Sequence, residues 1–150
     1  MFWKPETGML PCLSIRQPWA WLLVNGVKDI ENREWSTSYR GPLLLHAGKA
    51  GDEWLFDHKE FLVRMWQARY GVIEGMPTEG AGFARGGIVG IATLDQVVTH
   101  SPSKWFVGTY GFVLRDARPL PFIAYPGERK VFGVPPSVLA EKGVAHVPTA

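Results

Sequence analysis

Residues whose side chains can bind or activate a ligand are concentrated between positions 14 and 49 of this 150-residue chain. A carboxylate in such a cluster can act as a general base on water, and a lysine can stabilise an oxyanion or protonate a departing amine. Tryptophan and tyrosine rings can stack on a flat base, which arginine and glutamine can hydrogen-bond. The segment therefore suits either acid–base catalysis or the binding of a flat ligand. Its members are Arg16, Gln17, Trp19, Lys28, Glu31, Asn32, Arg33, Trp35, Tyr39, Arg40, His46 and Lys49.

Lys28 and Glu31 are two residues of opposite charge within this cluster, and local structure decides whether their side chains meet. We expect residues 28–33 to form a strand, in which alternation places Glu31 and Arg33 on one face and Lys28 on the other. A bulge at a barrel rim would break this alternation and bring Lys28 to Glu31. The alternative is a solvated strand whose surface salt bridges each contribute less than ~1 kcal/mol. Residue types alone leave both interpretations open.

Other reaction chemistries lack their sequence patterns. No glycine-rich phosphate loop and no GxSxG nucleophile elbow is present, so a nucleotide-dependent enzyme and a serine hydrolase are both disfavoured. The four histidines are scattered without metal-ligand spacing, and Cys12 is the single cysteine. We therefore expect no metal and no cofactor. His58 lies on the apolar face of an expected helix, where a structural role is favoured.

Composition limits the class of protein and of ligand. The net charge of +2 and the isoelectric point near 8.8 fall short of the strongly basic footprint of a protein that depends on phosphate contacts. Seven tryptophans suit a thick core or a stacking pocket. No apolar run reaches the length of a membrane span, and the first residues do not resemble a secretion signal. A cytoplasmic location is the expectation.

Hydrophobic patterning predicts short strands interrupted by helices. We expect helices after Pro18, over 52–70 and near 137–141, a glycine-rich loop over 71–87 that can act as a lid, and a frayed tail from 143 to 150. This pattern predicts one domain over 1–150 of the α+β class, a small and mostly antiparallel β-barrel with helices packed outside. The expected strands cover 10–15, 28–33, 42–47, 87–94, 110–114 and 131–134.

Three segments of the chain resemble the ASCH family. They are LSIRQPWA at 13–20, NGVKDIENREW at 25–35 and YRGPLLLHA at 39–47, and their order and spacing make the similarity specific. The stretches 87–95 and 110–114 also look like the family, so that the resemblance covers about residues 10–134. It implies a PUA-like β-barrel with a cleft between the barrel and its helices.

The resemblance also implies a range of functions. Members of the superfamily recognise RNA or modified bases, and some small bacterial ASCH proteins remove an acyl group from the exocyclic amine of cytidine. Others bind or cut single-stranded RNA. Lys28 matches the lysine of those amidohydrolases, whereas Glu31 stands where they have a threonine.

We therefore predict an amidohydrolase that converts N-acylcytidine to cytidine and a carboxylate, with Lys28 and Glu31 as catalytic residues whose loss leaves folding nearly intact. The partner is a pyrimidine nucleoside, with single-stranded RNA as a weak, salt-sensitive second ligand, and no membrane. The alternatives are a non-catalytic RNA or modified-base binding module, and a ribonuclease that uses Arg40, Lys49 and magnesium. The expected substrate-binding residues are Arg16, Gln17, Trp19, Arg33, Trp35, Tyr39, Arg40, His46 and Lys49.

Overall fold

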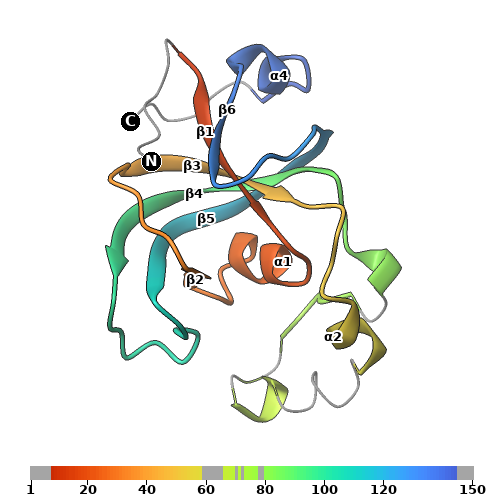
Figure 1. Cartoon of the computed structure of the whole chain (residues 1–150). Helices are drawn as coiled ribbons and strands as arrows, with labels where there is room; N and C mark the ends of the chain where they lie inside the picture. The colour runs from red at the N-terminus through yellow and green to blue at the C-terminus, as the bar shows by residue number, and fades with distance from the viewer. Residues whose placement is uncertain (1–7, 59–65, 70, 72, 78–79, 145–150) are drawn as a thin grey trace.

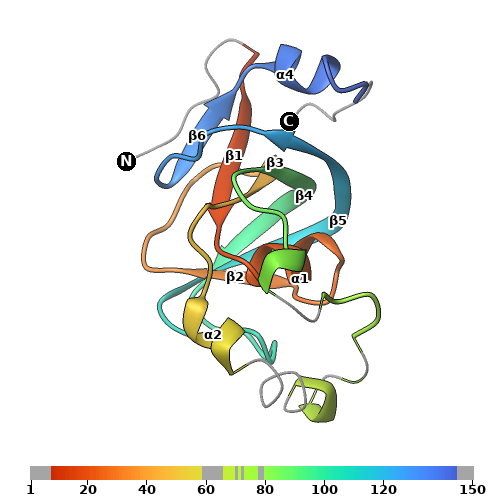
Figure 2. The same cartoon turned by 90° about the vertical axis from the view of Figure 1, so that its right-hand side faces the viewer.

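The structure is a computed structural model that describes residues 8–58, 66–69, 71, 73–77 and 80–144 (Figure 1). The strands are β1 (Leu10–Ile15), β2 (Ile30–Arg33), β3 (Gly41–Ala47), β4 (Gly87–Val98), β5 (Tyr110–Ala124) and β6 (Val131–Val134). The helices are α1 (Trp19–Val24), α2 (Glu53–Asp57) and α4 (Pro136–Ala140), with a 3-10 turn η1 at Gly80–Gly82. Helix α4 lies beside β6 at one end of the molecule, and α2 lies at the other (Figures 1 and 2).

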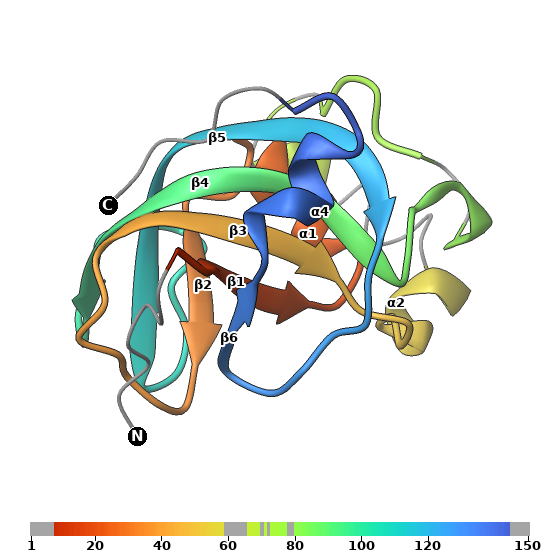
Figure 3. The ribbon, with the colours of Figure 1, turned by 90° about the horizontal axis from the view of Figure 1, so that it is seen from above.

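All six strands belong to one sheet in the order β2-β5-β4-β3-β1-β6. Neighbouring strands are antiparallel except for β1 and β3, which run parallel with Ser14 opposite His46. The sheet is strongly curved (Figure 3), although no ladder joins its edge strands β2 and β6 in the described part of the chain. The predicted α+β class with a mostly antiparallel sheet is confirmed.

Both faces of the sheet carry a hydrophobic core. Leu43 and Leu45 of β3 pack with α1 on one face, whereas Leu44 between them packs with α4 on the other. Successive side chains of a strand point to opposite faces, so a strand covered on both sides is apolar without interruption. Helix α1 ends at Val24 and is followed by its C-cap Asn25 and by Gly26. Gly26 has a φ of 72°, which suits glycine. These two layers fix β1 and β3, the strands that carry Ser14 and His46.

Three expected strands have other bounds in the structure. Strand β2 begins at Ile30, so Lys28 precedes it. Strand β4 continues to Val98 instead of ending at 94, and β5 continues to Ala124 instead of ending at 114. The β5 extension was not expected because it contains charged residues and two prolines. Register shifts between β4 and β5, with Asp116 at a φ of 54°, accommodate these residues.

The expected helix over 52–70 is described only at α2 and at 66–69, because 59–65 and 70 lie outside the described residues. Trp54 of α2 is 59% exposed and stacks on the exposed His58 ring. His58 is therefore an exposed residue, and its place on the apolar face of the expected helix does not bring it into the core. Residues 145–150 of the expected tail are also outside the described part. None of the described helices is both long and apolar enough to cross a membrane.

Candidate functional site

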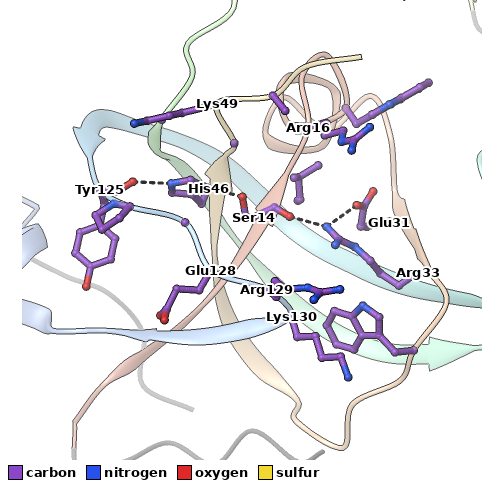
Figure 4. A pocket seen from close by; sticks show the side chains of 18 of the residues that line it. Ser14, Arg16, Glu31, Arg33, His46, Lys49, Tyr125, Glu128, Arg129 and Lys130 are labelled. Atoms are coloured by element: carbon purple, nitrogen blue, oxygen red, sulfur yellow. Dashed lines mark hydrogen bonds and ion pairs between the residues drawn. The ribbon is translucent and has the colours of Figure 1, made fainter. Parts of the chain in front are cut away.

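A pocket of about 810 Å³ opens where the ends of β1 and β3 meet β2 and the segment 125–130 between β5 and β6 (Figure 4). Arg16, Trp19, Glu31, Arg33, Trp35, His46 and Lys49, all predicted to be site residues, lie in its wall. Ser14, Asn32, Tyr125, Gly127, Glu128, Arg129 and Lys130 line it as well. The structure therefore brings together most of the expected cluster and adds a segment from near the C-terminal end of the chain.

Glu31 is the centre of a buried ion cluster at the pocket wall. One carboxylate oxygen lies 3.0 Å from Nζ of Lys28, and the other lies 3.0 Å from Nη2 of Arg33. Lys28 and Glu31 are 5% and 7% exposed, so both charges are largely removed from water. A buried charge needs a partner to offset its desolvation, and here one carboxylate serves two cations. Lys28 meets Glu31 because it precedes β2, not because of a bulge.

Arg33 extends this cluster to a second strand. It lies on the same face of β2 as Glu31, as the alternation predicts, and its Nη2 donates a 2.7 Å hydrogen bond to the carbonyl oxygen of Ser14 in β1. Its guanidinium also lies 6.0 Å from the ring centre of Trp35. The Arg33 Nε is buried without a hydrogen-bond partner among the described residues. Arg33 thus presents a fixed positive charge beside an aromatic wall.

Ser14, His46 and the main chain of Tyr125 form a hydrogen-bonded series next to this cluster (Figure 4). The His46 Nε2 lies 2.7 Å from the Tyr125 carbonyl oxygen, which can only accept, so Nε2 carries the hydrogen. In the neutral ring Nδ1 is then an acceptor, and the Ser14 hydroxyl donates to it at 2.9 Å. Burial lowers the pKa of His46 below its ordinary value of 6.5, although the bond to Tyr125 opposes this. His46 is therefore neutral near pH 7.

Four predicted site residues lie outside the pocket wall. Lys28 is buried behind Glu31, and the Gln17 amide donates to the carbonyl of Ala84 and accepts from the N–H of Trp21, each at 2.9 Å. Tyr39 is buried and its hydroxyl donates to the carbonyl of Pro42, and burial raises its pKa to about 12.

The fourth is Arg40, which donates to the carbonyls of Thr37 and Tyr39 in the turn before β3. Gln17, Tyr39 and Arg40 thus support the chain around the pocket, because each supplies a hydrogen bond to main-chain groups there.

Sequence patterns missed the contribution of Ser14 and of 125–130. The polar run GERK at 127–130 has the composition of an ordinary loop, and only the sheet order brings it to β1 and β3. Gly127 lies where this loop comes closest to the site, since an added Cβ would lie 2.7 Å from Cε1 of His46 and 3.1 Å from Oγ of Ser14. The loop approaches so closely that glycine is required there.

The pocket is positively charged at its rim. Lys49, Arg129 and Lys130 are exposed, and Lys130 lies 5.8 Å from the ring centre of Trp35. Glu128 is the exposed carboxylate among these lining residues. Within the described residues no three His, Cys, Asp or Glu side chains are grouped as a metal ion requires. The lining thus suits a flat ligand that carries hydrogen-bonding groups and tolerates or includes negative charge.

Comparisons with known proteins agree with this fold. The ASCH domain model matches residues 13–134. Activating signal cointegrator 1 from Homo sapiens is 56% identical over 36 residues, which are 24% of this chain and 6% of that protein, and the Mus musculus protein matches equally. The match thus spans a small part of these relatives.

Two solved structures from Zymomonas mobilis also match. The ASCH protein has a TM-score of 0.51 at 14% identity, covering 90% of this chain and 94% of that chain. A mutant of the same protein has a TM-score of 0.51 at 14% identity, covering 90% of this chain and 96% of that one. At this identity the likeness supports the fold alone.

Because Lys28 and Glu31 are buried, we expect their loss to destabilise the protein, contrary to the expectation from sequence. Glu31→Gln leaves both cations without a carboxylate and should lower the free energy of unfolding by about 3–5 kcal/mol. Lys28→Met should cost less, since Arg33 still holds Glu31. Urea denaturation measures these losses.

The matched control is Asp95→Asn, which breaks the exposed 3.1 Å pair with Arg115 and should cost less than ~1 kcal/mol. Equal losses for Glu31→Gln and Asp95→Asn would show that the Glu31 cluster has no structural role.

The lowered pKa of His46 predicts that the stability of the protein depends on pH. Since its pKa is lowered on folding, the unfolded chain binds more protons between the two pKa values, and this contribution to stability is lost as pH falls below about 6.5. His46→Gln should show a shallower loss over the same range. Thermal unfolding at a series of pH values compares the two proteins, and parallel curves would contradict the prediction.

Proposed function

The chain belongs to the ASCH domain family, and we propose that its pocket binds a cytidine-type nucleoside and hydrolyses an acyl amide on the exocyclic amine. The products are cytidine and a carboxylate. The observation that carries this proposal is the placement of a carboxylate and a guanidinium, Glu31 and Arg33, beside the ring of Trp35 in one pocket. The pocket volume of about 810 Å³ lies in the range typical of small-molecule sites.

Recognition of cytosine follows from the hydrogen-bonding groups at its edge. An N-acylated cytosine keeps one N–H on the exocyclic nitrogen and offers acceptors at N3 and O2. Glu31 can accept from that N–H, and Arg33 can donate to the acceptors. Trp35 is held against the ring of Phe112, with 5.2 Å between ring centres, and can stack on the base. A carboxylate next to a guanidinium thus matches a cytosine edge in both sign and order.

The simplest hydrolytic route is a single attack by water. Glu31 lines the pocket and can take a proton from water, while Arg33 stabilises the oxyanion. Lys28 does not line the pocket, so we propose that it positions Glu31 rather than contacting the substrate. This assignment keeps Glu31 at the reacting amide and moves Lys28 behind it.

A second candidate is favoured by the exposed cations at the rim. Lys49, Arg129 and Lys130 lie on the solvent side of the same pocket and can contact phosphate. We therefore propose single-stranded RNA as a weaker ligand, with one nucleotide in the pocket and its phosphate at the rim. The pocket would then act as a modified-base binding module.

Assay of acylated nucleosides tests the hydrolase directly. We expect the protein to convert N-acylated cytidines to cytidine, followed by ultraviolet absorbance, with little turnover of N-acylated adenosine. Glu31→Gln should lower kcat by about 10²–10⁴-fold, and Trp35→Leu should chiefly raise KM. Asp95→Asn serves as the control and should leave both constants unchanged. If the folded protein turns over none of the acylated cytidines, the proposed hydrolase activity is ruled out.

Salt dependence separates base recognition from phosphate binding. Nucleoside affinity should hardly change between about 50 and 200 mM salt, whereas oligonucleotide affinity should be weak and fall steeply because phosphate contacts release counterions. Replacing Lys49 and Lys130 with glutamine should flatten the oligonucleotide slope. Titration at several salt concentrations measures both ligands. Tight RNA binding together with no detectable nucleoside binding would favour the RNA-binding module instead.

A further inference from the structure

Ser14 and His46 have the geometry of a nucleophile and its base. Ser14 is opposite His46 in the parallel pairing of β1 and β3, so both side chains leave the sheet on the same face. Their hydrogen bond of 2.9 Å lies in the pocket wall, and Ser14 itself is only half-buried. A nucleophile must be reached by its substrate, and this hydroxyl borders a cavity large enough to hold one.

His46 is held in the tautomer that such a base requires. Its Nε2–H is committed to the Tyr125 carbonyl, which leaves the lone pair of Nδ1 facing the hydroxyl of Ser14. The ring is 1% exposed and contacts the edge of Phe132, with 6.0 Å between ring centres, so its orientation is fixed by packing. Nucleophile, base and orienting acceptor thus follow one another as in activated serine sites, with a main-chain oxygen in place of a carboxylate.

The surroundings of Ser14 include a cation and a close loop. Arg33 donates to the carbonyl oxygen of Ser14, which places a guanidinium next to the residue that carries the hydroxyl. Gly127 covers the pair so closely that a Cβ there would lie 3.1 Å from Ser14 Oγ and 3.1 Å from His46 Nδ1. The Ser14–His46 pair thus lies beside a guanidinium and under a close loop, at the border of the cavity.

We propose that Ser14 is the nucleophile of an acyl-transfer reaction in this pocket and that His46 is its general base. The choice of substrate rests on the proposed function, whereas the reactivity of Ser14 does not. Under this assignment Glu31 binds the amide N–H and holds Arg33. His46 takes the role of general base in place of Glu31.

The reaction has two balanced steps. Ser14 Oγ bonds to the acyl carbon and gives its proton to Nδ1 of His46. The C–N bond then breaks as that proton passes to the exocyclic nitrogen, so cytidine leaves and an acyl ester remains on Ser14. Water next attacks the ester and gives a proton to His46. The ester C–O bond breaks, the proton returns to Ser14 Oγ, and the carboxylic acid leaves.

Trapping the acyl ester tests the proposal. The full chain is mixed with N-acetylcytidine, or with p-nitrophenyl acetate as an activated donor, quenched in acid and analysed by intact mass and peptide mapping. One acetyl group on Ser14 is the expected result, with none in Ser14→Ala. His46→Gln should slow acylation at least about 10²-fold, the usual scale for loss of a general base. Ser103→Ala is the matched control, since Ser103 also donates a side-chain hydrogen bond, at 2.6 Å to Asp29, but lies outside the pocket wall.

A cysteine variant provides a second measurement that does not depend on the alanine variant. Ser14→Cys should react with iodoacetamide at least tenfold faster than Ser14→Cys combined with His46→Gln. Background labelling is expected to be low because the natural Cys12 is fully buried, and burial raises the pKa of its thiol. Equal alkylation rates in the two variants would overturn the role of His46.

The outcomes distinguish this inference from the proposed function. Equal cytidine release by the natural chain and by folded Ser14→Ala overturns the inference and leaves direct attack by water in place. Acylation of Ser14 by p-nitrophenyl acetate without hydrolysis of acylated cytidine supports the inference and removes the proposed substrate. Absence of both acylation and Ser14→Cys activation overturns the inference.

Discussion

The contact of Arg33 with both Glu31 and the Ser14 carbonyl is the interaction on which the rest of the site depends. In sheet order β2 is separated from β1 by β5, β4 and β3, so Arg33 reaches Ser14 only because the sheet is strongly curved. The same Nη2 binds the carboxylate at 3.0 Å and the carbonyl at 2.7 Å. Removing Glu31 would therefore take away the carboxylate that helps to fix this guanidinium across the open side of the sheet, and it would also change one wall of the pocket.

Parallel pairing of β1 and β3 provides the second constraint. The two strands end side by side, so Ser14 and His46 reach the pocket from neighbouring positions in the sheet, and neither residue lies on a loop. Hydrophobic cores on both faces hold these strands, and side chains placed on such strands are more rigid than side chains on loops. The loop 125–130 then closes against them, which is possible because Gly127 has no side chain. Rigid strands thus position the reactive pair, and the loop encloses it.

Much of this arrangement could be predicted from sequence, and the failures have physical causes. Uninterrupted apolar runs identified β1 and β3, and alternation placed Glu31 and Arg33 on one face of β2. The roles of Gln17 and Tyr39 could not be read from residue type, because a polar side chain that binds a ligand looks the same as one that binds the main chain. Ser14 was passed over because it lies in a strand and lacks the turn that marks familiar nucleophiles.

The distribution of charge within the pocket distinguishes two environments that the net charge alone does not show. At the buried end, Glu31 is paired with two cations, and this arrangement favours a neutral group that both donates and accepts hydrogen bonds. At the rim, Lys49, Arg129 and Lys130 are exposed to solvent, where long-range attraction acts on an approaching anion. A nucleotide has the same order of groups, with a neutral base at one end and a phosphate at the other. A net charge of +2 averages these two environments and conceals the difference between them.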